Sequence, residues 1–264
     1  MRDIPQGKGA VIVIQFQTIA VAFSIFSAVP VPQVEWNEKN TRYLLCAFPL
    51  VGVVCGGCWL GLSLLPLPDF LRGALFCLAP AAITGGIHLD GYADTCDALA
   101  SCGDTAKKQE ILKDPRCGAF AIIRLCSYFI LYLALGITLS PTMEAILCIG
   151  LGFVLSRTLS GWAVASLPLA EDADLVHTFA AAADRRRVRY FLGVLAAVLA
   201  VAQVAIGRFA GLAMAAAAGL ALWRYAHVAK TQFGGITGDL AGWFLQKCEL
   251  WQLAALVVCQ LLEV

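Results

Sequence analysis

Charged residues are scarce in this chain, at 14% of its 264 residues. An ordinary soluble domain carries about 25%, so the composition excludes that class. The formal net charge is only +1, which argues against a nucleic-acid platform, because such a platform needs a strongly basic face. Histidine is also rare, and the CxxC pair Cys55 and Cys58 has neither a second pair nor a histidine cluster to complete a zinc site.

Linkers, internal repeats and shifts of composition are missing too, so residues 1–264 are expected to form a single integral membrane domain. The chain is 60% hydrophobic with a mean hydropathy of +0.78. Apolar runs long enough to cross a bilayer recur along it, which predicts an all-α, polytopic helical membrane protein with about 7–8 transmembrane segments. The expected segments are 9–29, 43–64, 70–87, 118–139, 143–167, 190–207, 209–228 and 240–262.

The basic residues between these segments predict an orientation. The loops at 31–42, 86–117, 168–190 and 224–238 hold twelve Lys and Arg residues, four of them in the cluster Arg185 to Arg189. The opposite ends hold four, Arg2, Lys8, Arg72 and Arg208. By the positive-inside rule, the first set of loops faces the cytoplasm. A multi-pass protein of the cytoplasmic (inner) membrane is therefore expected, with its polar motifs on the cytoplasmic face.

Three carboxylates, Asp90, Asp94 and Asp97, fall within eight residues after a Gly85-Gly86 pair. Their spacing aligns them on one face of a helix, where like charges repel. A divalent cation would neutralise them, and an oxygen-only ligand set favours Mg²⁺ or Mn²⁺ over zinc. The alternative is a solvated helix face at the membrane border.

Two further groups of polar residues are candidates. Arg157 lies inside an expected span, where a guanidinium is costly and suggests a function such as phosphate binding. Glu249 would also be buried and needs a partner, for which Lys247 or a metal-site residue would serve. Asp239 follows a Gly-rich connector, where helix capping alone would explain it.

The remaining candidates lie near the aspartates in the sequence. His88 precedes the first aspartate by two residues and points away from the acidic face of a regular helix, as a supporting partner or a cap. Glu110 and Asp114 are four residues apart on an expected short helix ended by Pro115, and Arg116 follows in a polar turn. Glu110 and Asp114 are either a second carboxylate pair at the site or ordinary charges of a loop.

A carboxylate-bound metal, an intramembrane arginine and a Gly-rich backbone are typical of a phosphoryl or phosphodiester transferase. Two other functions compete with it. A lipid enzyme of the CDP-alcohol phosphotransferase type would perform the same chemistry, but the second half of its aspartate motif is missing here. A cation-coupled transporter would spread charges across the bilayer, whereas these gather toward one face. A non-catalytic scaffold is a third alternative.

The sequence resembles the cobalamin synthase family, the adenosylcobinamide-GDP ribazoletransferases, over most of its length. Residues 85–97 are similar to the family's GGxHLDGxADTxD signature, and 110–118 to its E-I-M-K/R-D-S-R-x-G. Shorter matches occur in the family's order at Val29-Pro-Val-Pro32, Phe48-Pro-Leu-Val-Gly52, Ser156-Arg157 and Gly235-Ile-Thr-Gly-Asp239. The chain departs from the family at Ala98, Pro115, Leu240 and Gln246.

The resemblance implies a Mg²⁺-dependent membrane transferase of cobalamin (vitamin B12) biosynthesis. Its substrates would be adenosylcobinamide-GDP and α-ribazole or its 5′-phosphate, and it would release GMP as the ribazole 3′-hydroxyl attacks the phosphorus attached to cobinamide. It implies that the protein contacts the lipid bilayer and binds no nucleic acid. Whether it forms homo-oligomers or associates with other corrinoid-pathway enzymes stays open.

The resemblance also implies roles for individual residues. The metal ligands would be Asp90 and Asp94, with Asp97 either completing the set or acting as general base. Asp94, Asp97 and Arg157 would take part in catalysis. Metal, substrate or phosphate contacts would come from His88, Asp114, Arg116, Arg157, Asp239 and Glu249.

Overall fold

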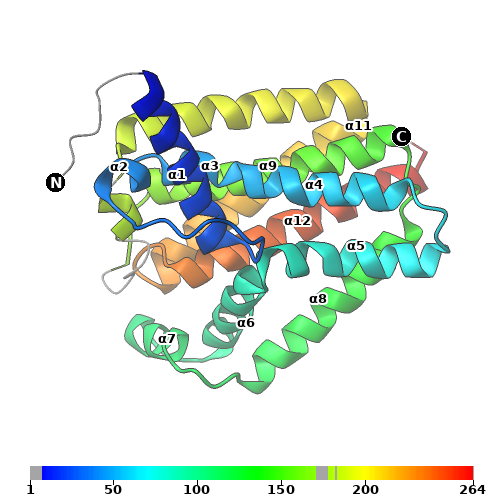
Figure 1. Ribbon diagram of the computed structural model, residues 1–264. Helices are drawn as coiled ribbons and strands as arrows, with labels where there is room; N and C mark the ends of the chain where they lie inside the picture. Colours follow the sequence, from blue (N-terminus) through cyan, green and yellow to red (C-terminus); the bar gives the residue numbers. More distant parts are fainter. Residues whose placement is uncertain (1–7, 171–177, 182, 264) are drawn as a thin grey trace.

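A computed structural model describes residues 8–170, 178–181 and 183–263 of the chain (Figure 1). Arg2, one of the residues used to predict the orientation, lies outside the described residues. The described part is helical, apart from one isolated bridge between Leu169 and Ile236. The expected all-α class is therefore confirmed.

The described helices are α1 Lys8–Phe26, α2 Glu38–Thr41, α3 Leu44–Ala47, α4 Pro49–Ser63, α5 Asp69–Thr84, α6 Ile87–Ala100, α7 Thr105–Leu112, α8 Ala119–Thr138, α9 Met143–Ser166, α11 Arg185–Gln232 and α12 Gly238–Leu261. The longer apolar helices follow the expected segments, whereas α2, α6 and α7 lie in the polar stretches between them. Helix α11 has 48 residues but is broken at Arg208, where φ is 50° and ψ is −120°. This break lies at the predicted boundary between the segments 190–207 and 209–228.

Several of the helices could cross a membrane. Among the described residues, four helical stretches are long and apolar enough: Leu44–Ser63, α8, α9 and α11. A fifth is added if α5 and α6 count as one broken span, although they are bent by 96°. This supports a polytopic membrane protein, and it leaves the predicted number of seven to eight spans as a prediction.

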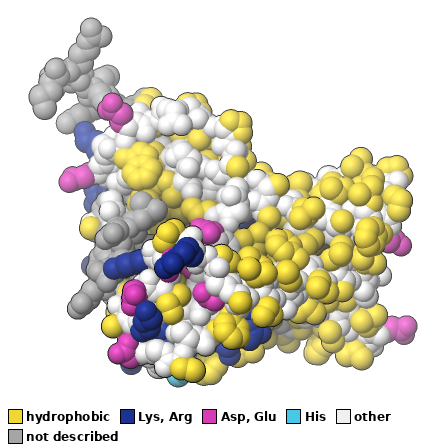
Figure 2. Space-filling model, turned by 90° about the horizontal axis from the view of Figure 1, so that it is seen from below, with side chains coloured by type: hydrophobic (Ala, Val, Ile, Leu, Met, Phe, Trp, Pro, Cys, Tyr) yellow, Lys and Arg dark blue, Asp and Glu magenta, His cyan; other side chains and the backbone are white. Residues whose placement is uncertain are grey.

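The charged side chains gather at one end of the molecule. Figure 1 shows α2, α6, α7 and the beginnings of α11 and α12 at one end, with the C-terminus at the other. In Figure 2 most Lys, Arg, Asp and Glu side chains of the visible face lie toward one end, and hydrophobic side chains cover most of the rest. The predicted grouping of the basic loops at a common end is thus seen in the fold.

Helix α12 lies at the centre of the bundle, packed against α6, α9 and α11. It is 24 residues long but is not among the apolar candidate spans. The reason is a series of polar side chains that it turns inward, among them Gln246, Glu249 and Gln252, all of which are buried. The other helices shield α12 from the surroundings, so its surface need not be apolar. Its buried polar side chains instead need hydrogen-bond partners within the protein.

The turn between α5 and α6 depends on two glycines. Gly85 and Gly86 have φ values of 65° and 81°, in the left-handed region that glycine adopts without steric cost. The amides of both residues bond back to the last turn of α5, which closes that helix. Helix α6 then leaves the direction of α5 by 96°, so that it lies at the polar end of the molecule and carries its acids away from the crossing helices.

Helix α6 then packs directly against the backbone of α12. A Cβ atom added at Gly91 would lie 2.7 Å from the Cα of Asp239, and one added at Gly242 would lie 2.9 Å from the carbonyl oxygen of His88. Both distances are shorter than real Cβ contacts allow. Only glycine at these two positions therefore permits the spacing that places α6 beside the start of α12.

We expect Gly91→Ala to separate these helices, because the added methyl group meets backbone that cannot rotate away. The free energy of unfolding should fall by about 1–3 kcal/mol, as for other overpacked sites, with loss of activity. Gly57→Ala is the matched control, since its Cβ would meet nothing within 4 Å. Thermal unfolding in detergent distinguishes the two variants, and equal stability of both would contradict the packing described.

Candidate active site

The aspartates of α6 lie on one face of that helix, as predicted. Asp90 is exposed and Asp94 and Asp97 are half-buried, whereas residues 91–93, 95, 96 and 98 are buried. Cys96 is among these buried residues, so it is turned away from the carboxylates. The helix thus presents an acidic face beside an apolar one.

Asp239 of α12 adds a fourth carboxylate near this face. Helix α12 is capped by Thr237, whose hydroxyl accepts a hydrogen bond from the amide of Leu240 at 3.2 Å. Asp239 is therefore not needed as the cap, which removes the alternative explanation for it. The close contact at Gly91 brings its backbone against α6.

The carboxylates influence one another electrostatically. Burial, followed by the negative charges of Asp90, Asp239 and Asp97, raises the pKa of Asp94 to about 6. Burial and the charge of Asp90 also raise the pKa of Asp239. A protein pays for such a cluster in stability unless a cation or a proton offsets the charge, so the group is suited to bind a cation.

Asp97 and Asp114 have separate surroundings. The carboxylate of Asp97 packs so closely on Gly118 that a Cβ atom there would collide with it. Helix α7 ends at Leu112, so Asp114 lies beyond it, and the expectation that Glu110 and Asp114 share a helix was wrong. Asp114 instead accepts two hydrogen bonds from the Arg116 guanidinium, at 2.9 and 2.8 Å, which lowers its pKa to about 2.

The chemistry of these donors is compatible with Mg²⁺. In the part of the chain that the structure describes, no three His, Cys, Asp or Glu side chains converge closely enough to hold a metal ion by themselves. Mg²⁺ does not require such a cage, because it is commonly held by one or two carboxylates together with substrate phosphates and water. Asp90 and Asp94, with Asp239 beside them, supply oxygen donors of this kind.

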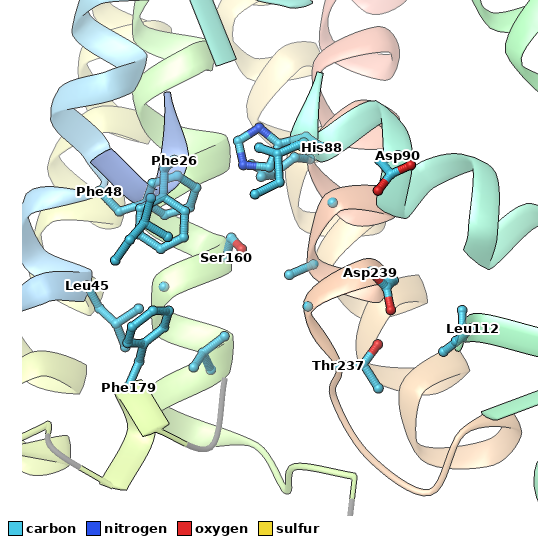
Figure 3. Close-up of a pocket in the computed structure, with 18 of the residues that line it drawn as sticks. Phe26, Leu45, Phe48, His88, Asp90, Leu112, Ser160, Phe179, Thr237 and Asp239 are labelled. Carbon is cyan, nitrogen blue, oxygen red and sulfur yellow. The ribbon is translucent and has the colours of Figure 1, made fainter. Parts of the chain in front are cut away.

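Two cavities meet at the acidic face. The first, the phenylalanine cavity, has a volume of about 300 Å³ and is lined on one side by Phe26, Phe48 and Phe179. Figure 3 shows these rings facing Asp90 and Asp239 across the space. The second, the open cavity, has a volume of about 760 Å³ and is bordered by 85–87, 89, 90, 93, 94, 112–115, 117, 125 and 129.

Sequence reasoning did not single out Lys113, which lines both cavities together with Asp90. It follows the end of α7 directly and is exposed. The available signal was its place between Glu110 and Asp114 in the segment that resembles a family motif. A cation beside a carboxylate cluster is a suitable partner for a substrate phosphate.

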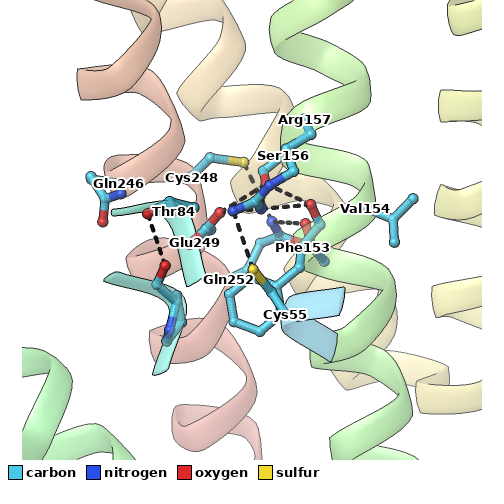
Figure 4. A network of polar contacts seen from close by, with 12 residues as sticks. Cys55, Thr84, Phe153, Val154, Ser156, Arg157, Gln246, Cys248, Glu249 and Gln252 are labelled. Carbon is cyan, nitrogen blue, oxygen red and sulfur yellow. Dashed lines mark hydrogen bonds and ion pairs between the residues drawn. The ribbon is translucent and has the colours of Figure 1, made fainter. Parts of the chain in front are cut away.

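The expected partner of Glu249 was Lys247 or a metal-site residue, and the structure corrects this. Arg157 Nη1 lies 2.7 Å from Glu249 Oε1, and the side chains are 1% and 2% exposed. Ser156 also donates to Glu249 at 3.1 Å (Figure 4). Neither Arg157 nor Glu249 lines the two cavities described above, so the pair lies behind the acidic face rather than on it.

His88 occupies an intermediate position. It lines the phenylalanine cavity, is 6% exposed and stacks obliquely on Phe48 with ring centroids 5.8 Å apart. Within the described residues, its Nδ1 atom has no hydrogen-bond partner. Arg116 differs, because its side chain is 87% exposed and paired with Asp114. Of the predicted residues, Asp90, Asp239 and His88 line the phenylalanine cavity, while Asp90, Asp94 and Asp114 line the open one.

The fold and site define a helical membrane protein with a carboxylate cluster at its polar end. Residues 18–257 match the family described as cobalamin-5-phosphate synthase, and the chain belongs to this family. An adenosylcobinamide-GDP ribazoletransferase of Lachnoclostridium phytofermentans is 41% identical over 245 residues, covering 91% of this chain and 93% of the relative. Relatives of the same name from Clostridium perfringens and Listeria monocytogenes are 29% and 31% identical, covering 87% and 86% of this chain and 93% and 91% of their own. No solved structure matches the chain.

Removal of one partner of the buried ion pair should be costly, because the other charge is left uncompensated. We expect Glu249→Ala to lower the free energy of unfolding by about 3–5 kcal/mol, and the double variant Arg157→Met, Glu249→Leu to recover much of it. Arg116→Ala is the control and should leave the free energy of unfolding close to that of wild type, because this side chain is exposed. The free energy of unfolding of these three variants is measured in detergent micelles. A Glu249→Ala protein as stable as wild type would refute the structural role of the Arg157–Glu249 ion pair.

Proposed function

We propose that this protein is an adenosylcobinamide-GDP ribazoletransferase, which joins adenosylcobinamide-GDP to α-ribazole or its 5′-phosphate. The family match over residues 18–257 carries the proposal. The 41% identity to a relative of that name over 91% of the chain supports it, as does the carboxylate cluster between two cavities. The gathering of charges at one end (Figure 2) agrees with this enzyme better than with a transporter, whose charges would follow a path through the bilayer.

The reaction forms one bond and breaks one. The ribazole 3′-hydroxyl oxygen bonds to the phosphorus attached to cobinamide, and the bond from that phosphorus to the bridging diphosphate oxygen breaks. GMP leaves with that oxygen, and the hydroxyl proton passes to a carboxylate. The products are the cobalamin, or its 5′-phosphate, and GMP.

Asp90 and Asp94 are the residues we assign to hold Mg²⁺ together with substrate phosphates, and Asp239 lines the same cavity as Asp90. When bound, the ion offsets negative charge on the diphosphate and the transferred phosphorus centre. The raised pKa values of Asp94 and Asp239 support this assignment, because burial first and the neighbouring carboxylates second disfavour their charged forms, and a bound cation would offset both effects.

The remaining polar residues align the substrates. Lys113 lies between the two cavities and is placed to bind diphosphate oxygens. Asp97 either completes the metal set or accepts the hydroxyl proton, and its contact with Gly118 fixes its position. Asp114 lines the open cavity and accepts hydrogen bonds from Arg116, which we assign to a phosphate of the incoming substrate.

Arg157 and Glu249 act as positioning residues in this account. Their ion pair joins α9 to α12, the helix that carries Asp239. The phosphate contact first expected of Arg157 would require this pair to open. We therefore assign to it the placement of α12 against the rest of the site.

The protein would cross the cytoplasmic membrane seven or eight times, with the acidic end in the cytoplasm. The predicted excess of basic residues at that end supports this orientation. A nucleotide-activated substrate would then reach the open cavity from the cytoplasm, and Mg²⁺ would be available there.

Asp90→Ala and Asp94→Asn should each lower kcat at least a hundredfold, because each removes a ligand that offsets charge in the transition state. The measurement is release of GMP by purified protein supplied with adenosylcobinamide-GDP, α-ribazole 5′-phosphate and Mg²⁺. Asp69→Asn, an exposed acid at the far end of the molecule, is the control and should retain activity. Absence of product with wild-type protein, or undiminished product with Asp90→Ala, would refute the proposed function.

The orientation can be tested by labelling with a membrane-impermeant maleimide. In intact protoplasts, Cys102 and Cys117, both exposed at the acidic end, should react only after the membrane is permeabilised. A cysteine placed at the opposite end by Asp69→Cys should react at once. The reverse pattern would show that the acidic end faces outward.

A further inference from the structure

The two cavities at the acidic face differ in ways that suggest different ligands. They share Ile87, Asp90, Leu112 and Lys113, so ligands bound in each would meet beside Asp90. The phenylalanine cavity holds about 300 Å³ and the open cavity about 760 Å³. A transferase with two substrates needs such a meeting point, with the reacting groups close together and the rest of each substrate kept apart.

The phenylalanine cavity has an aromatic wall opposite its acids. The ring centroids of Phe26 and Phe48 are 4.3 Å apart, and those of Phe26 and Phe179 are 6.2 Å apart. Figure 3 shows the three rings along one side, with Leu45 beside Phe179. Such a wall accepts a flat apolar ring system through stacked and edge contacts.

Few polar groups interrupt this wall. Ser160 points into the cavity from α9 (Figure 3), and His88 lies between the rings and Asp90. The Nδ1 atom of His88 has no hydrogen-bond partner among the residues described, although the residue is 6% exposed. Buried polar atoms are normally paired, and this atom would find a partner if the imidazole turned toward the cavity and met a ring nitrogen of a ligand.

We infer that the phenylalanine cavity binds the benzimidazole ring of ribazole, with the ribose directed toward Asp90 and Asp239. The inference rests on the proposed function. A dimethylbenzimidazole ring is flat, largely apolar and carries one unsubstituted ring nitrogen, which matches the aromatic wall and His88. The open cavity then receives the diphosphate of adenosylcobinamide-GDP beside Asp94 and Lys113.

The other aromatic and macrocyclic groups of the substrates suit this cavity less well. Guanine carries several hydrogen-bonding groups around its edge, and those that lie against the phenylalanine rings would be left unpaired. The corrin macrocycle is too large for about 300 Å³. The apolar lining therefore favours the benzimidazole among the groups that must be bound.

Filling each cavity separately tests this assignment. Val164 of α9 lines only the phenylalanine cavity, and Leu125 of α8 only the open one. We expect Val164→Phe to raise KM for α-ribazole 5′-phosphate at least tenfold, with less than a twofold change in KM for adenosylcobinamide-GDP. Leu125→Phe is the matched control and should leave KM for ribazole within twofold of wild type. Ser160→Val narrows the same cavity and should have a smaller effect of the same kind if Val164→Phe does not fold.

A substrate analogue separates a direct contact from a general disturbance of the fold. An α-riboside of unsubstituted benzimidazole lacks the two methyl groups. The rise in KM caused by Val164→Phe should therefore be at least threefold smaller for this analogue than for α-ribazole. A rise in KM for adenosylcobinamide-GDP alone, or an equal rise for both substrates with no preference for the smaller base, would overturn the inference. Inactivity of the wild-type protein would instead refute the proposed function, so the two failures can be told apart.

Discussion

The close approach of α6 and α12 is the constraint on which the rest of the site depends. Glycine at positions 91 and 242 lets two backbones meet at distances that any side chain would prevent. The contact brings Asp239 beside the acidic face of α6, where burial and then like charges raise the pKa of Asp94 to about 6. The packing thus concentrates negative charge in one place, which is unfavourable for the empty protein and favourable for a cation with its phosphates.

The interior of the bundle maintains this contact with polar interactions. Helix α12 is surrounded by other helices and carries buried amide and carboxylate groups, which would be unfavourable in lipid. Tyr128 donates to Gln246 at 2.5 Å, and Arg157 pairs with Glu249 at 2.7 Å. Buried ionic pairs add little net stability compared with apolar packing, but they penalise any other register strongly. We regard this network as the device that fixes the position of α12, and hence of Asp239.

Much of this arrangement could be predicted from the sequence. Hydrophobic runs predicted the long apolar helices to within about five residues, but not α2, α6 or α7, which lie in polar stretches. The spacing of Asp90, Asp94 and Asp97 predicted their common face. Capping of α12 could not be decided, because Thr237 and Asp239 are both acceptable caps and only the structure shows which one is used. The partner of Glu249 was also inaccessible, since Arg157 is distant in the chain and no local spacing connects them. The phenylalanine cavity depends on side chains from α1, α3, α6, α7, α9 and α12 together, so no single segment could indicate it.

The most direct test of the account is electron paramagnetic resonance of Mn²⁺ bound in place of Mg²⁺, in the presence of adenosylcobinamide-GDP. If Asp90, Asp94 and Asp239 form one cation site across two helices, each Asp→Asn change should weaken Mn²⁺ binding at least tenfold. Asp114→Asn should leave it nearly unchanged, because that carboxylate is already paired with Arg116. Undiminished Mn²⁺ binding in both Asp94→Asn and Asp239→Asn would contradict the account.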